Sequence, residues 1–146
     1  KRIIRVLEIY HKTGKTKTQQ EKESRKNEVK YNFKVFAISM DRNKLYEKIE
    51  KRVDQMIEQG LVEEVKCIMK KYSHFPTAMQ GLGYKEVVEF LQGKSTKQEM
   101  IDKIKKETRH YAKRQLTWFR RNKEIIWLDG EKSIEENIDL IINKYN

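Results

Sequence analysis

Two short apolar runs, residues 31–38 and 124–128, constrain the fold most strongly. The first, YNFKVFAI, begins as an alternation and ends in an unbroken apolar stretch, the pattern of a strand whose far end is covered on both faces. The second, EIIWL, is the other strand candidate, and about 85 residues separate the two runs. Two strands this short do not make a stable independent sheet. We therefore expect a mainly α chain with two strands, whose sheet is completed by sequence that is not shown.

Helical periodicity fills the rest of the sequence. Residues 1–13 predict a helix that ends at Gly14, and residues 15–30 predict an exposed, mobile loop. Asp41 is expected to cap a helix, and Gly60 to separate it from a second helix. The remaining predicted helices cover residues 84–92, residues 95–122 with a capping box of Ser95 and Gln98, and residues 133–145 with a capping box of Ser133 and Glu136.

The charge of the chain is concentrated in two bands. Its 33 Lys and Arg against 22 Asp and Glu give a net charge of +11 over 146 residues. Residues 1–52 carry +9 and residues 94–123 carry +8, whereas the segments that follow each of them are mildly acidic. A phosphate-binding surface needs its cations gathered in this way, so nucleic acid is the predicted partner. The alternative is a solvated, lysine-rich surface.

Other features of the composition exclude whole classes. No run of eighteen apolar residues is present, so we expect a soluble protein without membrane contact. The single cysteine, Cys67, cannot form an intrachain disulfide, which favours a reducing compartment. His11, His74 and His110 are scattered, and no metal-binding cluster or catalytic triad is predicted. Residues 14–16, GKT, lack the earlier glycine and the preceding strand of a P-loop.

Arg52 lies in an unexpected position on its predicted helix. At about 100° per residue it falls inside the arc of Leu45, Ile49 and Met56, so it faces the core. A snorkelling side chain or a buried ion pair would explain this position. The functional alternative is a guanidinium that points into a cleft and binds an anion, most commonly phosphate.

The long helix over residues 95–122 predicts a cationic side and an apolar side. Gln115 falls within the apolar side, and Arg114 lies at its edge. These two residues are either structural or placed to stack on unpaired bases and to contact an RNA backbone. The predicted cationic side consists of Lys103, Lys106, Arg109, Lys113 and Arg120, and the predicted apolar side of Met100, Ile101, Ile104, Tyr111, Trp118 and Phe119.

The turn over residues 80–85, QGLGYK, leads into a predicted helix. Its two glycines could let backbone amides approach a phosphate, or they could simply form a turn between helices. The residues themselves leave both alternatives open.

Four stretches together resemble a known family. They are RIIRVLEIYHKTGK (2–15), YEKIEKRVDQMIEQGLVEEV (46–65), QGLGYKEVVEFL (80–91) and KKETRHYAKRQLTWFRR (105–121). In this order they resemble the carboxy-terminal half of the bacterial tRNA dimethylallyltransferases, also called tRNA isopentenyltransferases. The resemblance implies transfer of a dimethylallyl group from dimethylallyl diphosphate to the exocyclic amine of the adenosine just 3′ of the anticodon. It also implies a P-loop-type, nucleotide-binding α/β core and a target base taken out of its stack.

The resemblance also implies roles for individual residues. Arg52 matches the family arginine associated with the diphosphate of the prenyl donor, a catalytic role. Gly81 departs mildly from the family pattern, in which a small residue other than glycine is more usual. The tRNA-contacting positions that the resemblance implies are Lys1, Arg2, Ile3, Ile4, Arg5, Gln80, Gly81, Leu82, Gly83, Tyr84, Lys85, Lys113, Arg114, Gln115, Leu116, Thr117, Trp118, Phe119 and Arg120.

The same resemblance sets the expected organisation, cofactor and partners. Residues 1–30 would be the end of a helical tRNA-contacting insertion with a charged loop, residues 31–128 the last part of the catalytic core, and residues 129–146 a carboxy-terminal helix. Mg²⁺ is the implied cofactor, with its ligands, the P-loop and the catalytic aspartate all in a missing amino-terminal half, so that this chain alone is expected to be inactive. The implied partners are the tRNA anticodon stem-loop and dimethylallyl diphosphate, and we expect a cytoplasmic monomer. A non-catalytic RNA-binding module and a purely structural helical domain are the alternatives.

Overall fold

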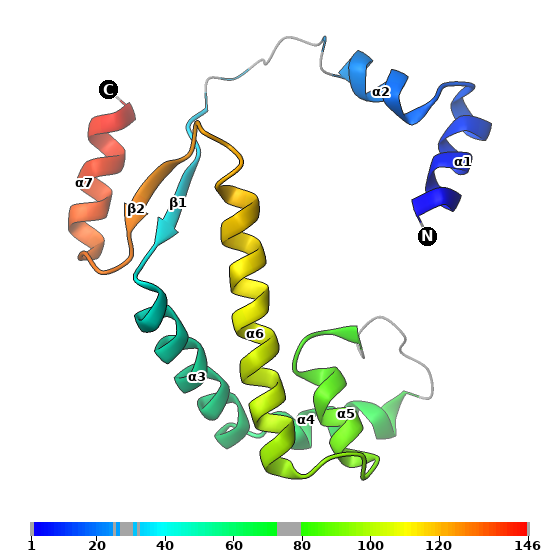
Figure 1. Cartoon of the computed structure of the whole chain (residues 1–146), viewed down its shortest axis with the longest axis vertical. Helices are drawn as coiled ribbons and strands as arrows, with labels where there is room; N and C mark the ends of the chain where they lie inside the picture. The colour runs from blue at the N-terminus through cyan, green and yellow to red at the C-terminus, as the bar shows by residue number, and fades with distance from the viewer. Residues whose placement is uncertain (1, 25, 27–30, 32, 73–79, 146) are drawn as a thin grey trace. The chain divides into compact units, whose positions relative to one another are not determined.

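The computed structural model describes residues 2–24, 26, 31, 33–72 and 80–145, and the chain divides into two compact units, Lys1–Phe33 and Lys34–Asn146 (Figure 1). The first unit contains α1 (Arg2–Thr13) and α2 (Lys17–Ser24). Gly14 ends α1 as predicted, with a φ of +66° and its N–H donating to the carbonyl of Tyr10 at 2.8 Å.

Helix α2 corrects the expectation of a loop over residues 15–30. Thr16 and Gln19 bond reciprocally at its start, as in a capping box. The helix has no apolar face, so periodicity could not reveal it, and it is built from polar residues that favour helices. Residues 25 and 27–30 of the predicted loop lie outside the described residues.

The second unit is mostly helical with two parallel strands, as predicted. Strands β1 and β2 pair in parallel, with Phe36 opposite Ile126 and Ser39 opposite Asp129. Its elements are, in order, β1 (Phe36–Ser39), α3 (Arg42–Glu58), α4 (Leu61–Lys71), α5 (Tyr84–Leu91), α6 (Lys97–Phe119), β2 (Ile126–Asp129) and α7 (Ile134–Tyr145). The helices described between the strands, α3 to α6, therefore belong to one long crossover connection (Figure 1).

The strands are shorter and less covered than the sequence predicted. β1 begins at Phe36 rather than at residue 31, and Ile38 is 65% exposed while its partner Leu128 is 6% exposed. Within this chain the far end of β1 is therefore not covered on both faces; the strands expected to complete its sheet were placed in sequence that is not shown, so their covering of β1 stays a prediction. After β2, Gly130 passes so close to β1 that an added Cβ would lie 2.8 Å from the Ile38 Cγ2 atom and 2.9 Å from the Met40 Cε atom. Only glycine fits at this position without rearrangement.

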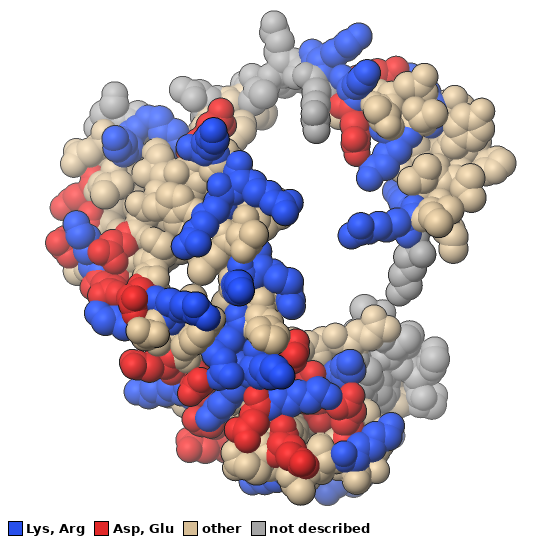
Figure 2. All heavy atoms as spheres, viewed as in Figure 1, with Lys and Arg blue, Asp and Glu red and all other residues tan. Residues whose placement is uncertain are grey.

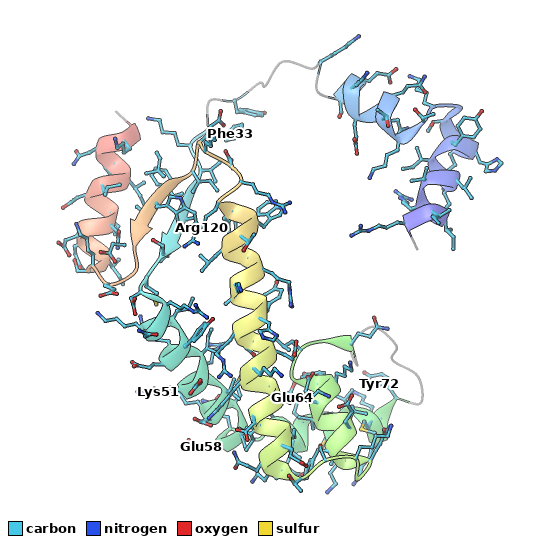
Figure 3. All side chains as sticks on the ribbon, viewed as in Figure 1. Phe33, Lys51, Glu58, Glu64, Tyr72 and Arg120 are labelled. Carbon is cyan, nitrogen blue, oxygen red and sulfur yellow. The ribbon has the colours of Figure 1, made fainter. Side chains whose placement is uncertain are left out.

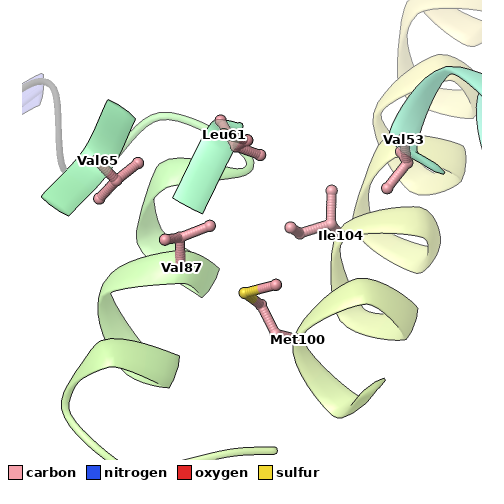
Figure 4. Packing of buried hydrophobic residues seen from close by; sticks show 6 residues of the cluster. All are labelled: Val53, Leu61, Val65, Val87, Met100 and Ile104. Atoms are coloured by element: carbon pink, nitrogen blue, oxygen red, sulfur yellow. The ribbon is translucent and has the colours of Figure 1, made fainter. Parts of the chain in front are cut away.

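The buried core lies among the four crossover helices (Figure 4). Val65 and Val87 are fully buried, and Met100 and Ile104 of α6 are 1% and 2% exposed. These contacts fix α6 against α3 on one side and against α5 on another. The core cluster consists of Val53, Leu61, Val65, Val87, Met100 and Ile104.

The cap of α3 is the predicted residue, whereas the cap of α6 lies one residue later than predicted. Asp41 caps α3 as predicted, accepting bonds from the N–H groups of Asn43 and Lys44. Helix α6 is capped by Thr96 with Glu99, so the predicted pair Ser95 and Gln98 is one residue too early. The Glu99 carboxylate accepts bonds from both the N–H and the hydroxyl of Thr96, whereas the amide of Gln98 donates to Asp102.

Helix α7 begins as predicted. Ser133 and Glu136 bond reciprocally at its start, at 3.0 and 3.1 Å. The side-chain amide of Asn137 donates to the carbonyl of Asp129, which ties α7 to the end of β2. Among the described residues, no helix is both long and apolar enough to cross a membrane.

Candidate nucleic-acid interface

The two halves of α6 have different surroundings. Met100 and Ile104, in the first half, are buried against α3, α4 and α5. Tyr111 and Trp118, in the second half, are 49% and 66% exposed, and Gln115 is exposed as well. The prediction of an apolar, packed side along the whole helix is therefore wrong beyond about residue 108. Periodicity identifies a face of a helix, but it does not tell how far the neighbouring helices extend.

The predicted cationic side of α6 also divides at this point. In the first half, Lys103 pairs with Glu89, Lys105 with Asp54 and Arg109 with Glu50. The Lys105 Nζ lies 2.7 Å from the Asp54 carboxylate, and this lysine side chain is only 19% exposed. Hydrogen bonding between Lys103 and Glu89 raises the pKa of the lysine and lowers that of the glutamate. These three cations hold α6 to α3 and α5, whereas Lys106 of the predicted cationic side is exposed and forms no salt bridge with a described carboxylate.

The cations in the second half of α6 are exposed and unpaired. Lys113, Arg114 and Arg120 form no salt bridge with any carboxylate that the structure describes. The Arg114 guanidinium lies 5.8 Å from the centre of the Tyr111 ring, which confirms the predicted neighbourhood of arginine and aromatics. Figure 2 shows Lys and Arg side chains gathered on the visible face of this part of the molecule. Charge that no internal partner neutralises is available to phosphates.

A surface groove brings two predicted segments together. Residues 80–85 and 113–120 are separated in the sequence by most of α5 and the first half of α6, yet Lys85 and Arg114 line the same groove. Tyr111 of α6 lines the groove as well. The groove is lined by Gln80, Gly81, Leu82, Lys85, Glu86, Lys103, Glu107, Tyr111 and Arg114, and we call it the α5/α6 groove.

Glu86 stabilises the turn on one side of the α5/α6 groove through a hydrogen bond to its backbone. This glutamate is 4% exposed, and its carboxylate accepts a bond from the N–H of Gly83 at 2.9 Å. Gly83 has a φ of +93°, a conformation that other residues rarely adopt. Glu86 therefore fixes the backbone of the turn, and the sequence analysis did not identify it. A glutamate three residues after Gly83, at the start of a helix, was the available signal.

A second glutamate that the sequence analysis missed supports the same turn. The Tyr84 hydroxyl donates to the carboxylate of Glu64 on α4. This hydrogen bond, together with burial, raises the pKa of Tyr84 above its usual value. Nothing in the sequence links Glu64 to Tyr84, because the contact exists only once α4 packs against α5.

Two further pockets border the exposed half of α6. The first lies between β1, α3 and α6, where Gln115, Leu116 and Phe119 face Phe36 and Ile38. The second lies at the start of α3, where Lys113, Thr117 and Arg120 meet Asp41, Arg42 and Tyr46. In Figure 3 the Arg120 label marks the carboxy-terminal end of α6. Every residue from 113 to 120 therefore lines one of the described pockets.

Arg52 is placed differently from the expectation. It is exposed on α3, so the prediction that it faces the core is wrong; the buried residues of this helix are Ile49 and Val53. Within the described part of the chain its guanidinium has neither a hydrogen-bond partner nor a carboxylate within ion-pair distance. The buried ion pair considered for it is therefore absent there. An unpaired, exposed guanidinium remains able to bind an anion.

The remaining predicted contact segment lies in the first unit. Arg2, Ile3, Ile4 and Arg5 are exposed on α1, with Ile3 77% exposed, and Arg5 pairs with Glu8 at 3.2 Å. Lys1 lies outside the described residues.

No candidate metal site is found in the described part of the chain. Among the described residues, no three or more His, Cys, Asp or Glu side chains converge as a candidate metal site. The Mg²⁺ cofactor that the family resemblance implies, with ligands expected outside this chain, stays a prediction.

Comparison with known proteins gives a consistent result. The family model described as IPP transferase matches residues 1–122. A tRNA dimethylallyltransferase of Natranaerobius thermophilus is 50% identical over 99% of this chain and 45% of its own length, and one of Carboxydothermus hydrogenoformans is 46% identical over 99% and 47%. The solved structure of a tRNA delta(2)-isopentenylpyrophosphate transferase from Staphylococcus epidermidis superposes with a TM-score of 0.75 and 35% identity, covering 99% of this chain and 48% of that one.

These matches show the class of protein to which the chain belongs. A mostly helical chain with two parallel strands matches the carboxy-terminal portion of α/β transferases, and it spans less than half the length of the relatives that it matches. The chain belongs to the IPP transferase family.

Proposed function

We propose that this chain is the tRNA-holding, carboxy-terminal portion of a tRNA dimethylallyltransferase. The complete enzyme would transfer the dimethylallyl group of dimethylallyl diphosphate to the exocyclic amine of the adenosine just 3′ of the anticodon. The observation that carries the proposal is the α5/α6 groove, where Lys85 and Arg114 come from two distant segments, both of which resemble tRNA-contacting segments of the family. The names of the relatives support the same substrates.

The distribution of charge supports RNA as the ligand of the α5/α6 groove. Three cations of the first half of α6 are neutralised by Glu50, Asp54 and Glu89, whereas Lys97, Lys106 and the cations beyond residue 112 form no salt bridge with a described carboxylate. We propose that the unpaired cations contact phosphates of the anticodon stem-loop, while the residues of the turn border its loop.

The salt dependence of tRNA binding tests this proposal. Affinity for an anticodon stem-loop, measured by fluorescence anisotropy with the complete enzyme, should fall linearly with the logarithm of the salt concentration. Each phosphate contact contributes roughly 0.7 to 0.9 to the slope. An RNA-binding surface of several cations therefore gives a slope of about −3 or steeper. A flat salt response would overturn the proposal.

Arg52 has a separate proposed role, in catalysis. As the amine attacks C1 of the prenyl donor, the bond from C1 to the diphosphate oxygen breaks, and negative charge develops on the departing oxygens. The amine would give up a proton to the catalytic aspartate that the resemblance places outside this chain. The exposed, unpaired Arg52 guanidinium would stabilise this charge more strongly in the transition state than in the bound donor. The family's use of Mg²⁺ remains a prediction from resemblance.

Kinetics of the complete enzyme test the role of Arg52. Arg52→Ala should lower kcat by about 100-fold or more while leaving tRNA affinity within about twofold. Lys51→Ala, which removes the neighbouring exposed cation, is the matched control and should leave kcat unchanged. Unchanged turnover in Arg52→Ala would discard the role.

A further inference from the structure

Exposed aromatic side chains are concentrated on one face of the second half of α6. Trp118 is 66% exposed, which is unusual because a tryptophan of a globular protein generally buries most of its surface. Its recorded ring contact is a T-shaped one with Phe119, with ring centres 5.0 Å apart and planes at 78°. Such a contact orients the indole without covering it, since most of its surface remains accessible.

Tyr111, Arg114 and Trp118 share this face. Their spacing of three and four residues brings them within about 60° of one another around the helix. They extend over about 10 Å along the axis, at roughly 1.5 Å per residue. The guanidinium of Arg114 lies 5.8 Å from the Tyr111 ring centre, so the series alternates aromatic, planar cation and aromatic. Tyr111 and Arg114 also line the α5/α6 groove, which makes Trp118 its continuation along α6.

Cations surround the indole. A surface hollow beside Trp118 is lined by Lys113, Arg114, Thr117 and Arg121, and none of the three cations forms a salt bridge with a described carboxylate. The Thr117 hydroxyl donates to the carbonyl of Lys113, so it holds its position on the helix. An aromatic plane bordered by free cations matches the two parts of an unpaired nucleotide: a base to stack on the ring and a phosphate to meet the charge.

We propose that Trp118 is a stacking platform for an unpaired nucleobase of the bound RNA, with Lys113 and Arg121 contacting the phosphates that flank this base. This inference rests on the proposed function and specifies how one part of the same surface recognises RNA. A double-stranded region does not offer a free base face to the indole. The platform therefore selects single-stranded loop nucleotides, and it does so with little preference for base identity, because every base has an aromatic face.

The decisive test separates base contacts from phosphate contacts. Affinities of the complete enzyme are measured for an anticodon stem-loop and for the same stem-loop carrying abasic nucleotides throughout its loop. Trp118→Ala should weaken binding of the intact stem-loop by about tenfold. It should leave binding of the abasic form within about twofold, because the phosphates are unchanged. Trp118→Phe should retain most of the affinity for the intact stem-loop.

Tyr72 provides a matched control. It is 51% exposed at the end of α4 with Lys71 5.5 Å from its ring centre, so it too pairs an exposed ring with a cation. Figure 3 labels it far from Arg120, which marks the carboxy-terminal end of α6. Tyr72→Ala should leave both affinities unchanged. An equal loss for Trp118→Ala and Tyr72→Ala would overturn the inference.

The remaining outcomes are also distinct. If the unaltered enzyme fails to bind the intact stem-loop, the proposed function itself fails. If the unaltered enzyme binds, two results refute the platform while RNA binding stands. In the first, Trp118→Ala lowers the affinities for the intact and the abasic stem-loop equally. In the second, it lowers neither affinity. A ring that is covered by another part of the protein or by a protein partner would give one of these last two results.

Discussion

At the scale of single residues, pairing distinguishes the cations of α6 better than their position in the sequence does. Lys105 and Arg109 face carboxylates of α3, whereas Lys113 and Arg114 face none that the structure describes. Cations on one helix therefore fall into two groups, those that hold the helices together and those that we propose attract a polyanion. Substitutions should separate these purposes.

The first prediction is that one substitution on α6 weakens tRNA binding, whereas another lowers the stability of the fold. Arg114→Ala should lower tRNA affinity and reduce the salt slope by about 1, because one phosphate contact is lost. Lys105→Ala should leave the salt slope unchanged and lower the free energy of unfolding by up to about 1 kcal/mol, because Asp54 loses its partner. Anisotropy titrations and urea unfolding measure the two quantities. Loss of stability without loss of affinity in Arg114→Ala would refute this division.

Residue-level reasoning from sequence succeeded where the signal was local. The capping role of Asp41 and the neighbourhood of Arg114 and Tyr111 follow from spacing along one helix. The exposure of Arg52 did not follow, because the helical projection places a residue relative to its own helix and not relative to the neighbours that cover it. The roles of Glu64 and Glu86 depend on how α4, α5 and the turn pack together.

At the scale of elements, the turn before α5 has a conformation that a buried residue fixes, and we propose that this turn borders the bound RNA. Gly83 supplies a positive φ, and the buried carboxylate of Glu86 accepts its N–H. The two together preset the backbone of residues 80–83 beside the α5/α6 groove. Preset loops lose less conformational entropy on binding.

The second prediction concerns this turn. Glu86→Ala leaves the Gly83 N–H without its acceptor, and it should weaken stem-loop binding by about 10-fold, whereas Glu86→Gln keeps an acceptor and should restore most of the affinity. A purely structural role would instead reduce stability without this rescue in affinity. Binding titrations, with thermal unfolding as the control for folding, distinguish the two.

The third prediction is the pH dependence of helix caps. The pKa values of Asp41 and Glu99 are lowered, chiefly by backbone N–H groups that bond to their carboxylates at the starts of α3 and α6. A carboxyl group with a lowered pKa in the folded state contributes stability that is fully present above its unfolded value, 3.8 for Asp41 and 4.5 for Glu99. This stability is lost as the pH falls through the lowered values.

Unfolding at a series of pH values measures this effect. The contribution of these two caps to the free energy of unfolding should be nearly constant between pH 5 and 7 and should decrease below about pH 4. The variant Asp41→Asn should show a shallower decrease, because its cap carries no titrating proton. An unchanged pH profile in this variant would contradict the assignment of Asp41 as a charged cap.

At the scale of the whole molecule, sequence patterns predicted the fold class but not how completely the chain covers its own apolar surface. The parallel pairing of β1 and β2 agrees with the expectation of two strands in a parallel sheet. In the same unit, however, Ile38 is 65% exposed, and Ile134 and Ile142 of α7 are 75% and 52% exposed. A strand pattern indicates which residues suit burial, and neighbouring elements decide whether burial occurs.

The fourth prediction concerns the chain by itself. We expect it to transfer no dimethylallyl group to tRNA, because the family resemblance places the P-loop and the catalytic aspartate in sequence that is not shown. It should nevertheless retain salt-dependent binding to an anticodon stem-loop. Prenyl transfer by the isolated chain would contradict the division of roles between the two halves.

The central claim is that the α5/α6 groove holds tRNA for prenyl transfer. Incorporation of a radiolabelled dimethylallyl group into tRNA, measured with the complete enzyme carrying Lys85→Ala and Arg114→Ala together, tests it most directly. We predict a KM for tRNA raised by about 10-fold or more, with kcat within about threefold of the unaltered enzyme, because both residues bind RNA and neither is assigned to the chemistry. An unchanged KM for tRNA, or a complete enzyme that transfers no dimethylallyl group, would contradict it.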